Sequence, residues 1–281
     1  MNVSTRVLLL SLLSIAVAVP VFAEDILYSV SSRDDQLRVV DPTDASTLSM
    51  VTITIGGSPI VKSHGLATHP TTQELWALVQ TGANGDPRLL VTINKTTGVA
   101  TVVGDTGDLF TGLAFTTGGT LYAINGSGSA MDPDALAILS TLDGSPTFVL
   151  NPANGSGAQN IAYHPGDGFL YHFVGFDINK LFEKIHLGSL ADTPIPLSGT
   201  GFTLGRGLTY ESSGNFLLAM FASGGPTKPG GAEEFLTRLT DAGNVSLIGA
   251  LDHVSRGLAF ASLPVPVERT SWGRLKGSTP Q

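Results

Sequence analysis

Five polar residues recur at nearly constant spacing along this 281-residue chain and could together bind an anion. Each directly precedes one copy of a short repeated motif, and in order they are His64, Thr111, Gln159, Arg206 and Arg256. If the repeats close into a ring, Arg206, Arg256 and His64 follow one another around it and form a basic arc. A guanidinium group pairs bidentately with carboxylate or phosphate, so this arc predicts a site for a small acidic ligand. The alternative is a solvated rim in which the arginines pair with aspartates of nearby loops, namely Asp105, Asp108 and Asp252.

A second, weaker hypothesis is a metal site built from His64, Asp252 and His253. His253 lies four residues before a copy of the motif, and ring closure would bring its loop next to the one that carries His64. Two imidazoles and a carboxylate suit a divalent transition metal. Loop histidines are more often simply solvated, so the sequence leaves the metal unknown.

Residues for most other chemistry are missing from the sequence. The chain has no Cys, which excludes disulfides, thiolate metal sites and cysteine nucleophiles. The expected inner strands carry no acidic residue, so the carboxylate pair of a glycoside hydrolase has no place there. Gly155-Ser156-Gly157 is not followed by a helical pattern, as the serine of a nucleophile elbow would be. We therefore predict no catalytic residue and no cofactor.

The motif that follows the five polar residues reads Gly-Leu-Ala or a close variant. Its copies begin at Gly65, Gly112, Asn160, Gly207 and Gly257, with spacings of 47, 48, 47 and 50 residues. A second motif, Leu-Tyr-Ala-Ile in its clearest copy, begins at Leu27, Leu75, Leu121, Leu170 and Leu217. Turn residues separate the two motifs, and two further strands follow them, as at 89–94 and 99–103. Four strands in each unit of about 48 residues are the signature of a β-propeller blade.

The order of the motifs predicts how the ring closes. The chain opens with the second motif and ends with the first, so the strand at 26–31 lacks a preceding partner and that at 257–262 lacks a following one. Joining them leaves no unpaired edge in that blade, whereas an open solenoid would need capping repeats that the sequence lacks. We therefore expect an all-β, five-bladed β-propeller with a composite closing blade. Ile178 to Ile185 show helical spacing, but the repeat register predicts a third strand there.

Several single residues have a structural interpretation. The small residues of the first motif are expected where neighbouring inner strands converge near the axis. Asn160 replaces Gly in one copy; lactonase-like propellers hold a metal with Glu, Asn and Asp, but a polar residue in a wet channel is the simpler interpretation. His69 and His164 each precede Pro in equivalent turns, which indicates a role in the turn.

Residues 1–23 are predicted to be a signal peptide that is cleaved near Ala23, because Arg6 is followed by an apolar stretch ending in small residues. We expect the propeller to occupy 24–262 and a flexible tail to occupy 263–281. No later apolar run approaches the ~20 residues of a membrane span. The net charge of -8 argues against a nucleic-acid partner, and we expect an exported monomer, periplasmic or extracellular.

The repeat units resemble those of exported bacterial propellers of the YncE-like and NHL-like kind, a similarity carried by units such as 111–115 followed by 121–124. It implies the fold and a secreted binding role. We therefore expect a non-catalytic exported protein that binds a small acidic ligand or a protein partner on a loop face at the channel mouth. The alternative is a metal-assisted hydrolase or lactonase with its site at the same mouth.

Overall fold

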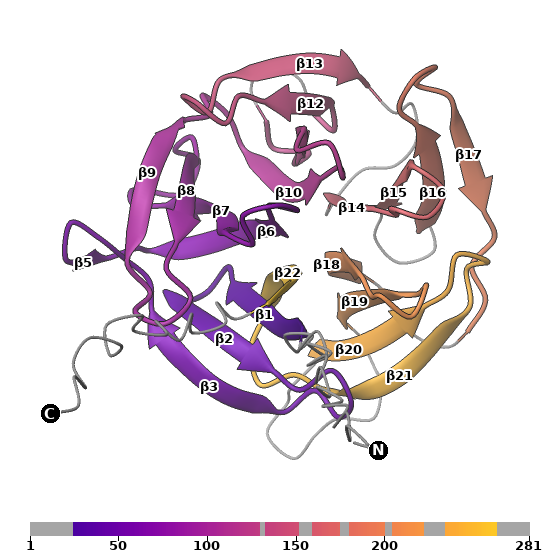
Figure 1. The fold of residues 1–281 in the computed structure, drawn as a ribbon, viewed down its shortest axis with the longest axis horizontal. Coiled ribbons are helices and arrows are strands. Elements are labelled where there is room, and N and C mark those ends of the chain that lie inside the picture. The colour runs from indigo at the N-terminus through magenta and orange to yellow at the C-terminus, as the bar shows by residue number, and fades with distance from the viewer. Residues whose placement is uncertain are drawn as a thin grey trace, which may run out of the picture.

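The computed structural model describes residues 25–129, 133–151, 159–174, 180–199, 204–221 and 234–262. Their strands form five four-stranded antiparallel sheets that are arranged like blades around a central channel (Figure 1). The predicted five-bladed β-propeller is therefore confirmed. The described residues contain no helix, and thus none that could cross a membrane.

Four of the blades are built from consecutive strands, each beginning at the channel and ending at the outer edge. They are β6 (Lys62–Thr68), β7 (Leu75–Gln80), β8 (Leu89–Ile93) and β9 (Ala100–Asp105); β10 (Phe110–Phe115), β11 (Leu121–Asn125), β12 (Leu136–Leu139) and β13 (Pro146–Leu150); β14 (Gln159–Tyr163), β15 (Phe169–Val174), β16 (Leu181–His186) and β17 (Asp192–Ile195); and β18 (Leu204–Tyr210), β19 (Phe216–Phe221), β20 (Glu234–Leu239) and β21 (Val245–Ala250). The strand β16 confirms the third strand that the repeat register predicts in place of a helix. Ile178 lies outside the described residues.

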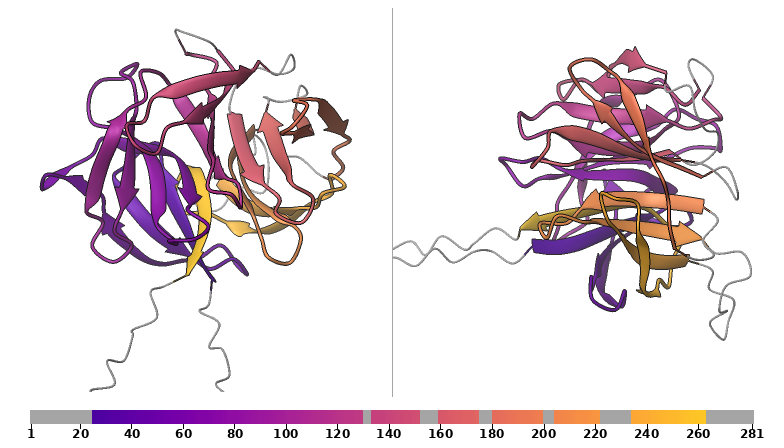
Figure 2. Two further views of the ribbon diagram at one scale, coloured as in Figure 1. Left: turned by 45° about the horizontal axis from the view of Figure 1, so that its top comes forward. Right: turned by 90° about the vertical axis from the view of Figure 1, so that its right-hand side faces the viewer.

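The fifth blade joins the two ends of the propeller. It contains β22 (Ser255–Ser262), β1 (Asp25–Ser31), β2 (Gln36–Val40) and β3 (Thr47–Thr52), in that order from the channel outwards. The strands β1 and β22 pair antiparallel from Asp25 opposite Ser262 to Ser31 opposite Ser255. The composite closing blade is thus confirmed, and the start of β1 lies beside the end of β22 (Figure 2).

A small hairpin, absent from the sequence-based prediction, connects the closing blade to the next one. Its strands are β4 (Thr54–Ile55) and β5 (Ser58–Pro59). The two central residues of its turn, Gly56 and Gly57, have φ of 58° and 84°. Such a Gly-Gly pair favours the two-residue turns that connect hairpins, because both positions require positive φ.

Apolar side chains fill the spaces between neighbouring blades. One buried cluster, for example, combines Tyr28 and Val30 of β1 with Leu66 of β6 and Ala77 of β7. Similar clusters lie between the other pairs of adjacent sheets. The core is therefore divided among the blade interfaces, and each interface depends on the closure of the ring.

The small residues of the first motif lie where two inner strands approach each other. A Cβ atom on Gly65 would lie 3.1 Å from backbone atoms of Gly112 and Leu113 in the next blade. At the one position where Asn160 replaces Gly, its Nδ2 donates a hydrogen bond to the carbonyl of Gly205 at 3.0 Å. Asn160 is only 2% exposed, so its interpretation as a polar residue in a wet channel is wrong. It is part of a blade interface.

We expect Gly257→Ala to destabilise the propeller much more than Gly207→Ala. A Cβ on Gly257 would lie 2.6 Å from the Leu66 nitrogen, whereas one on Gly207 would lie 3.3 Å from the nearest atom, the Gly257 nitrogen. The first substitution forces two backbones apart and should lower the free energy of unfolding by about 2 kcal/mol. The second should change it little, because the reduced freedom of the unfolded chain offsets a small clash. Urea denaturation of both variants tests this, and equal losses would contradict it.

Candidate functional site

The candidate site lies at the end of the channel where the inner strands begin, which we call the N-terminal mouth. Three of the predicted residues are each the extra residue of a β-bulge, with no residue directly opposite on the neighbouring strand. They are Thr111, Arg206 and Arg256. His64 stays in the ladder because its bulge falls one residue later, at Gly65. A bulge turns a side chain out of the alternating pattern of its strand, which is why bulges are common beside functional sites.

Arg206 forms an ion pair with the first residue of β20, Glu234. Its Nη1 lies 2.5 Å from Glu234 Oε1, and its guanidinium carbon lies 5.0 Å from the centre of the Phe221 ring. Glu234 is 4% exposed, and burial raises its pKa to about 7 even though Arg206 favours the charged form. In the alternative interpretation Arg206 would pair with a loop aspartate, but its ion-pair partner is Glu234.

Arg256 is coupled to Arg206 by charge rather than by contact. Its Nε donates to Ser32 Oγ at 3.3 Å. Partial burial and then repulsion from Arg206 lower the pKa of Arg256 to about 10, while Glu234 opposes this shift. Arg206 therefore disfavours the charged form of Arg256, as a positive charge does when it is held close to another one away from water.

A third arginine, Arg88, belongs to the same mouth and was not predicted. It precedes β8, is 8% exposed, and donates from Nη1 to the carbonyl of Phe110 in the next blade. Burial and the charge of Arg256 lower its pKa to about 10, with Asp108 acting against them. Its buried Nε has no hydrogen-bond partner. We call Arg88, Arg206 and Arg256 the cationic cluster.

His64 lies within the field of this cluster but does not add to its charge. It is 7% exposed, and burial, with the charges of Arg88, Arg256 and Lys62, lowers its pKa to about 2. It is therefore neutral at physiological pH, and its buried Nε2 has no hydrogen-bond partner. The basic arc that we expected thus contains a neutral imidazole, and Arg88 supplies the third positive charge.

The two remaining predicted ligand-binding residues contribute differently. Thr111 Oγ1 donates to the carbonyl of Ile124 in its own blade at 3.3 Å. Gln159 begins β14 and pairs with Val174 without a bulge, and its side chain lies outside the described residues. Among the predicted residues, the charge of Arg256 acts on His64 and the charge of Arg206 acts on Arg256, while Thr111 bonds within its own blade.

The aspartates of the predicted rim have other partners. Asp108 accepts hydrogen bonds from the backbone of Leu109 at 2.8 Å and from Asn125 Nδ2 at 3.0 Å. Asp105, expected in a loop, is the last residue of β9 and accepts from the backbone of Gly107 at 2.8 Å. These bonds fix the loops between the blades.

Asp252 and His253 form a hydrogen-bonded chain with a serine of β1. His253 Nδ1 lies 2.8 Å from Asp252 Oδ1, and His253 Nε2 lies 2.7 Å from Ser29 Oγ, which also bonds Ser255 Oγ at 2.9 Å. The spacing matches that of a hydrolytic triad. Ser29 is fully buried, so a substrate could not reach it, and the chain instead ties the loop before β22 to β1. Because Ser29 and His253 lie 224 residues apart, the sequence did not reveal this contact.

The hypothetical metal site is not assembled. Both ring nitrogens of His253 are occupied, and no three His, Asp or Glu side chains in the described part of the chain lie together as a metal would require. His69 and His164 act in turns, as expected: the Nδ1 of His69 accepts from the backbone of Thr72 at 3.2 Å, and that of His164 from Gly166 at 3.1 Å.

Comparisons with known proteins support the fold. No family model and no curated protein matches the sequence. A chain of a nidogen–laminin complex is 12% identical, with a TM-score of 0.55 over 85% of this chain and 98% of that one. A protein of unknown function from Bacteroides caccae is 9% identical, with a TM-score of 0.53 over 84% and 98%. A protein assigned as TolB from Agrobacterium tumefaciens is 10% identical, with a TM-score of 0.51 over 86% and 91%.

Similarity at such low identity shows the fold alone. The repeat pattern, the sheet topology and these neighbours together define a β-propeller repeat protein. A propeller of this class is compatible with a binding or interaction role, because the same scaffold carries many functions.

Proposed function

We propose that this protein binds a small acidic ligand at the N-terminal mouth of the channel. The observation that carries the proposal is the cationic cluster, three arginines that are held at one mouth and on which two carboxylates of the described residues act, those of Glu234 and Asp108. Glu234 and Asp108 act on the cluster, but Asp108 is held by its own hydrogen bonds and Glu234 is partly protonated near neutral pH. An arginine withdrawn from water is stabilised by an anionic partner.

The geometry indicates how such a ligand would be held. Arg88 Nε and Arg206 Nε are buried and have no hydrogen-bond partner. A carboxylate or phosphate could accept hydrogen bonds from guanidinium groups in a bidentate manner. His64 would stay neutral and could contribute a hydrogen bond from its unpartnered Nε2. Binding would relieve the mutual repulsion of the arginines, which supports affinity in spite of the net charge of -8.

The setting of this binding function is proposed from the sequence. Residues 1–23, which lie outside the described residues, have the pattern of a cleaved signal peptide, so we propose that the protein is exported. As a separate proposal, it acts as a monomer. A loop face at the same mouth is the proposed location of a protein partner, if the acidic group belongs to one. A metal-assisted hydrolase or lactonase, the alternative from the sequence, gains no support from a ligand set among the described residues.

The Arg206→Met/Arg256→Met double variant tests the proposal. Met keeps much of the apolar stem and removes both charges, so we expect the fold to survive and the affinity for anions to fall at least tenfold, as for loss of charge-assisted hydrogen bonds. Phosphate, sulfate, succinate and citrate would be titrated by calorimetry and by thermal shift.

Arg238→Met is the matched control, because Arg238 pairs with Glu211 at 3.2 Å and takes no part in the cluster. It should bind anions as the parent does. If no anion binds the parent, or if the double variant binds equally well, the arginines form only a solvated rim.

A further inference from the structure

The N-terminal mouth contains a buried hydrogen-bond acceptor beside its arginine donors. Glu234 is 4% exposed and places Oε1 2.5 Å from Arg206 Nη1. Its other oxygen, Oε2, is buried and has no hydrogen-bond partner among the described residues. An ionised carboxylate can only accept hydrogen bonds. A ligand at this mouth therefore meets one group that needs a hydrogen as well as arginines that need acceptors.

Positive charges from three elements act on Glu234. They come from Arg206 of β18, Arg256 of β22 and Arg33 in the loop after β1. Burial raises the pKa of Glu234 and these charges lower it, with a result of about 7. Above this pH the carboxyl group is ionised and acts as an acceptor. The buried Nε atoms of Arg88 and Arg206 remain unpartnered donors at the same mouth.

Such a mixed set of donors and one acceptor discriminates between anions of equal charge. Hydrogen phosphate and sulfate are both tetrahedral dianions, but only hydrogen phosphate carries a hydrogen. Sulfate would turn an oxygen toward the carboxylate of Glu234, and neither group could donate a hydrogen bond to the other. A site that is built to hydrogen-bond a hydrogen of its ligand rejects the analogue that lacks this hydrogen.

We propose that the ligand of the N-terminal mouth is an oxyanion that carries one hydrogen, with hydrogen phosphate as its simplest member. Glu234 accepts the hydrogen bond from this hydrogen, and the arginines bind the remaining oxygens. The inference rests on the proposed function, because it identifies the class of anion that the same site takes. Glu234 is then a specificity-determining residue, since its ionised form disfavours every anion without a hydrogen.

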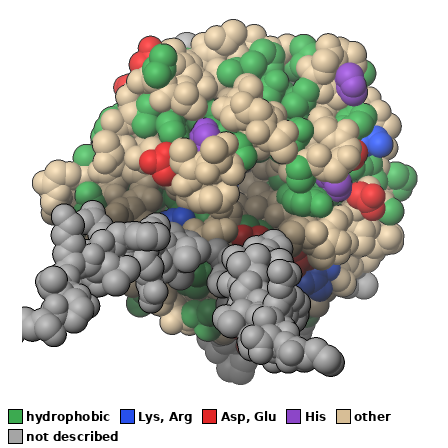
Figure 3. Space-filling view, in the orientation of Figure 1, with side chains coloured by type: hydrophobic (Ala, Val, Ile, Leu, Met, Phe, Trp, Pro, Cys, Tyr) green, Lys and Arg blue, Asp and Glu red, His purple; other side chains and the backbone are tan. Residues whose placement is uncertain are grey.

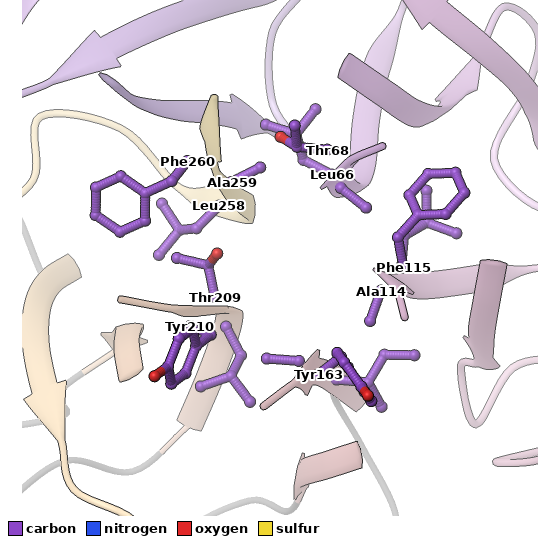
Figure 4. A pocket seen from close by; sticks show the side chains of 15 residues that line it. Leu66, Thr68, Ala114, Phe115, Tyr163, Thr209, Tyr210, Leu258, Ala259 and Phe260 are labelled. Carbon is purple, nitrogen blue, oxygen red and sulfur yellow. The ribbon is translucent and has the colours of Figure 1, made fainter. Parts of the chain in front are cut away.

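The opposite end of the channel offers an anion no charged partner among the described residues. It contains a cavity of about 130 Å³, on the face where β1 starts and β22 stops. None of the residues that line this cavity is charged, as Figure 4 shows for those that it labels. Lys and Arg side chains are sparse on the part of this face that is coloured in Figure 3. Titration with small anions should therefore report on the N-terminal mouth.

Phosphate and sulfate would be titrated by calorimetry at about pH 8.5, where Glu234 is ionised and phosphate keeps one hydrogen. We expect the parent to bind phosphate about tenfold more tightly than sulfate, the effect of one hydrogen bond to a charged group. Methyl phosphate has no hydrogen left at this pH and should bind as weakly as sulfate. In Glu234→Gln the amide can donate as well as accept, so the ratio of the phosphate and sulfate affinities should fall to about one.

Two control variants should keep the parent's preference for phosphate. Glu211→Gln is the matched control, because Glu211 pairs with Arg238 at 3.2 Å and not with the cationic cluster. Thr209→Val changes the cavity at the opposite end of the channel (Figure 4). Circular dichroism of each variant establishes that its fold is intact.

The possible failures of the two proposals can be told apart. If the parent binds sulfate or methyl phosphate as tightly as phosphate, the inference is overturned and the proposed function stands. The same holds if Glu234→Gln keeps the full preference for phosphate. If none of the anions binds the parent, the proposed function fails and the inference fails with it.

Discussion

A chain that ends at Val254 should not fold cooperatively, whereas a chain that ends at Val265 should melt at the same temperature as the full protein. The first truncation removes β22, which supplies the entire inner strand of the closing blade. It exposes the ladder edge of β1 and deletes the buried side chains of Leu258, Ala259 and Ala261. We expect the free energy of unfolding that is lost with this strand to exceed the ~5–15 kcal/mol by which most domains are stable.

The second truncation leaves every described strand intact and is the matched control. Thermal unfolding followed by circular dichroism would distinguish the two chains. Equal melting temperatures for both truncations and the full chain would show that the ring does not depend on β22. A broad, non-cooperative transition for the shorter chain alone would agree with the composite closing blade.

The fold could be predicted from the sequence because the repeated motif marks the positions where the backbones of neighbouring inner strands approach each other. A Gly or Asn before Leu or Ile recurs wherever two inner strands come within van der Waals contact, as Gly65 and Gly112 show. Its offset from the second motif also revealed which strands close the ring. Such packing constraints are the same in every blade, so each copy strengthened the same prediction.

The site could be predicted only in part, because side-chain partners do not follow the repeat. The position before each motif was a sound indicator of the mouth, and three of its residues proved to be at bulges. Glu234 begins β20 and Arg88 directly precedes β8, so neither lies on an inner strand and no periodic pattern marked them. Nor could residue type show that His64 is buried enough to stay neutral, because burial depends on packing between blades.

Glu234→Gln and His64→Gln should change the pH dependence of stability in opposite directions. Glu234 has a pKa of about 7 in the folded chain against 4.5 as its ordinary value, so the folded state holds a proton that the unfolded state has lost. The contribution of Glu234 to the free energy of unfolding is fully present below pH 4.5 and is lost as the pH rises through 7. At about 1.4 kcal/mol for each pKa unit, the loss is on the order of 3 kcal/mol.

His64 acts with the reverse sign. Its pKa falls from 6.5 to about 2 on folding, so the unfolded chain takes up a proton that the folded chain does not. The contribution of His64 to the free energy of unfolding is fully present above pH 6.5 and is lost as the pH falls toward 2. At pH 4 the loss is on the order of 3 kcal/mol. Between pH 4.5 and 6.5 the two groups oppose each other in the parent protein, which conceals both effects.

Removing one group should therefore reveal the other. Relative to the parent, Glu234→Gln should lose stability more steeply on acidification from pH 7 to 4.5, because His64 then acts alone. His64→Gln should instead lose stability more steeply as the pH rises over the same interval, because Glu234 then acts alone. Urea denaturation at several pH values measures both slopes, with Glu74→Gln and His186→Gln as controls for loss of an exposed side chain of each type. If all four variants run parallel to the parent, Glu234 and His64 are not withdrawn from water in the way that the N-terminal mouth requires.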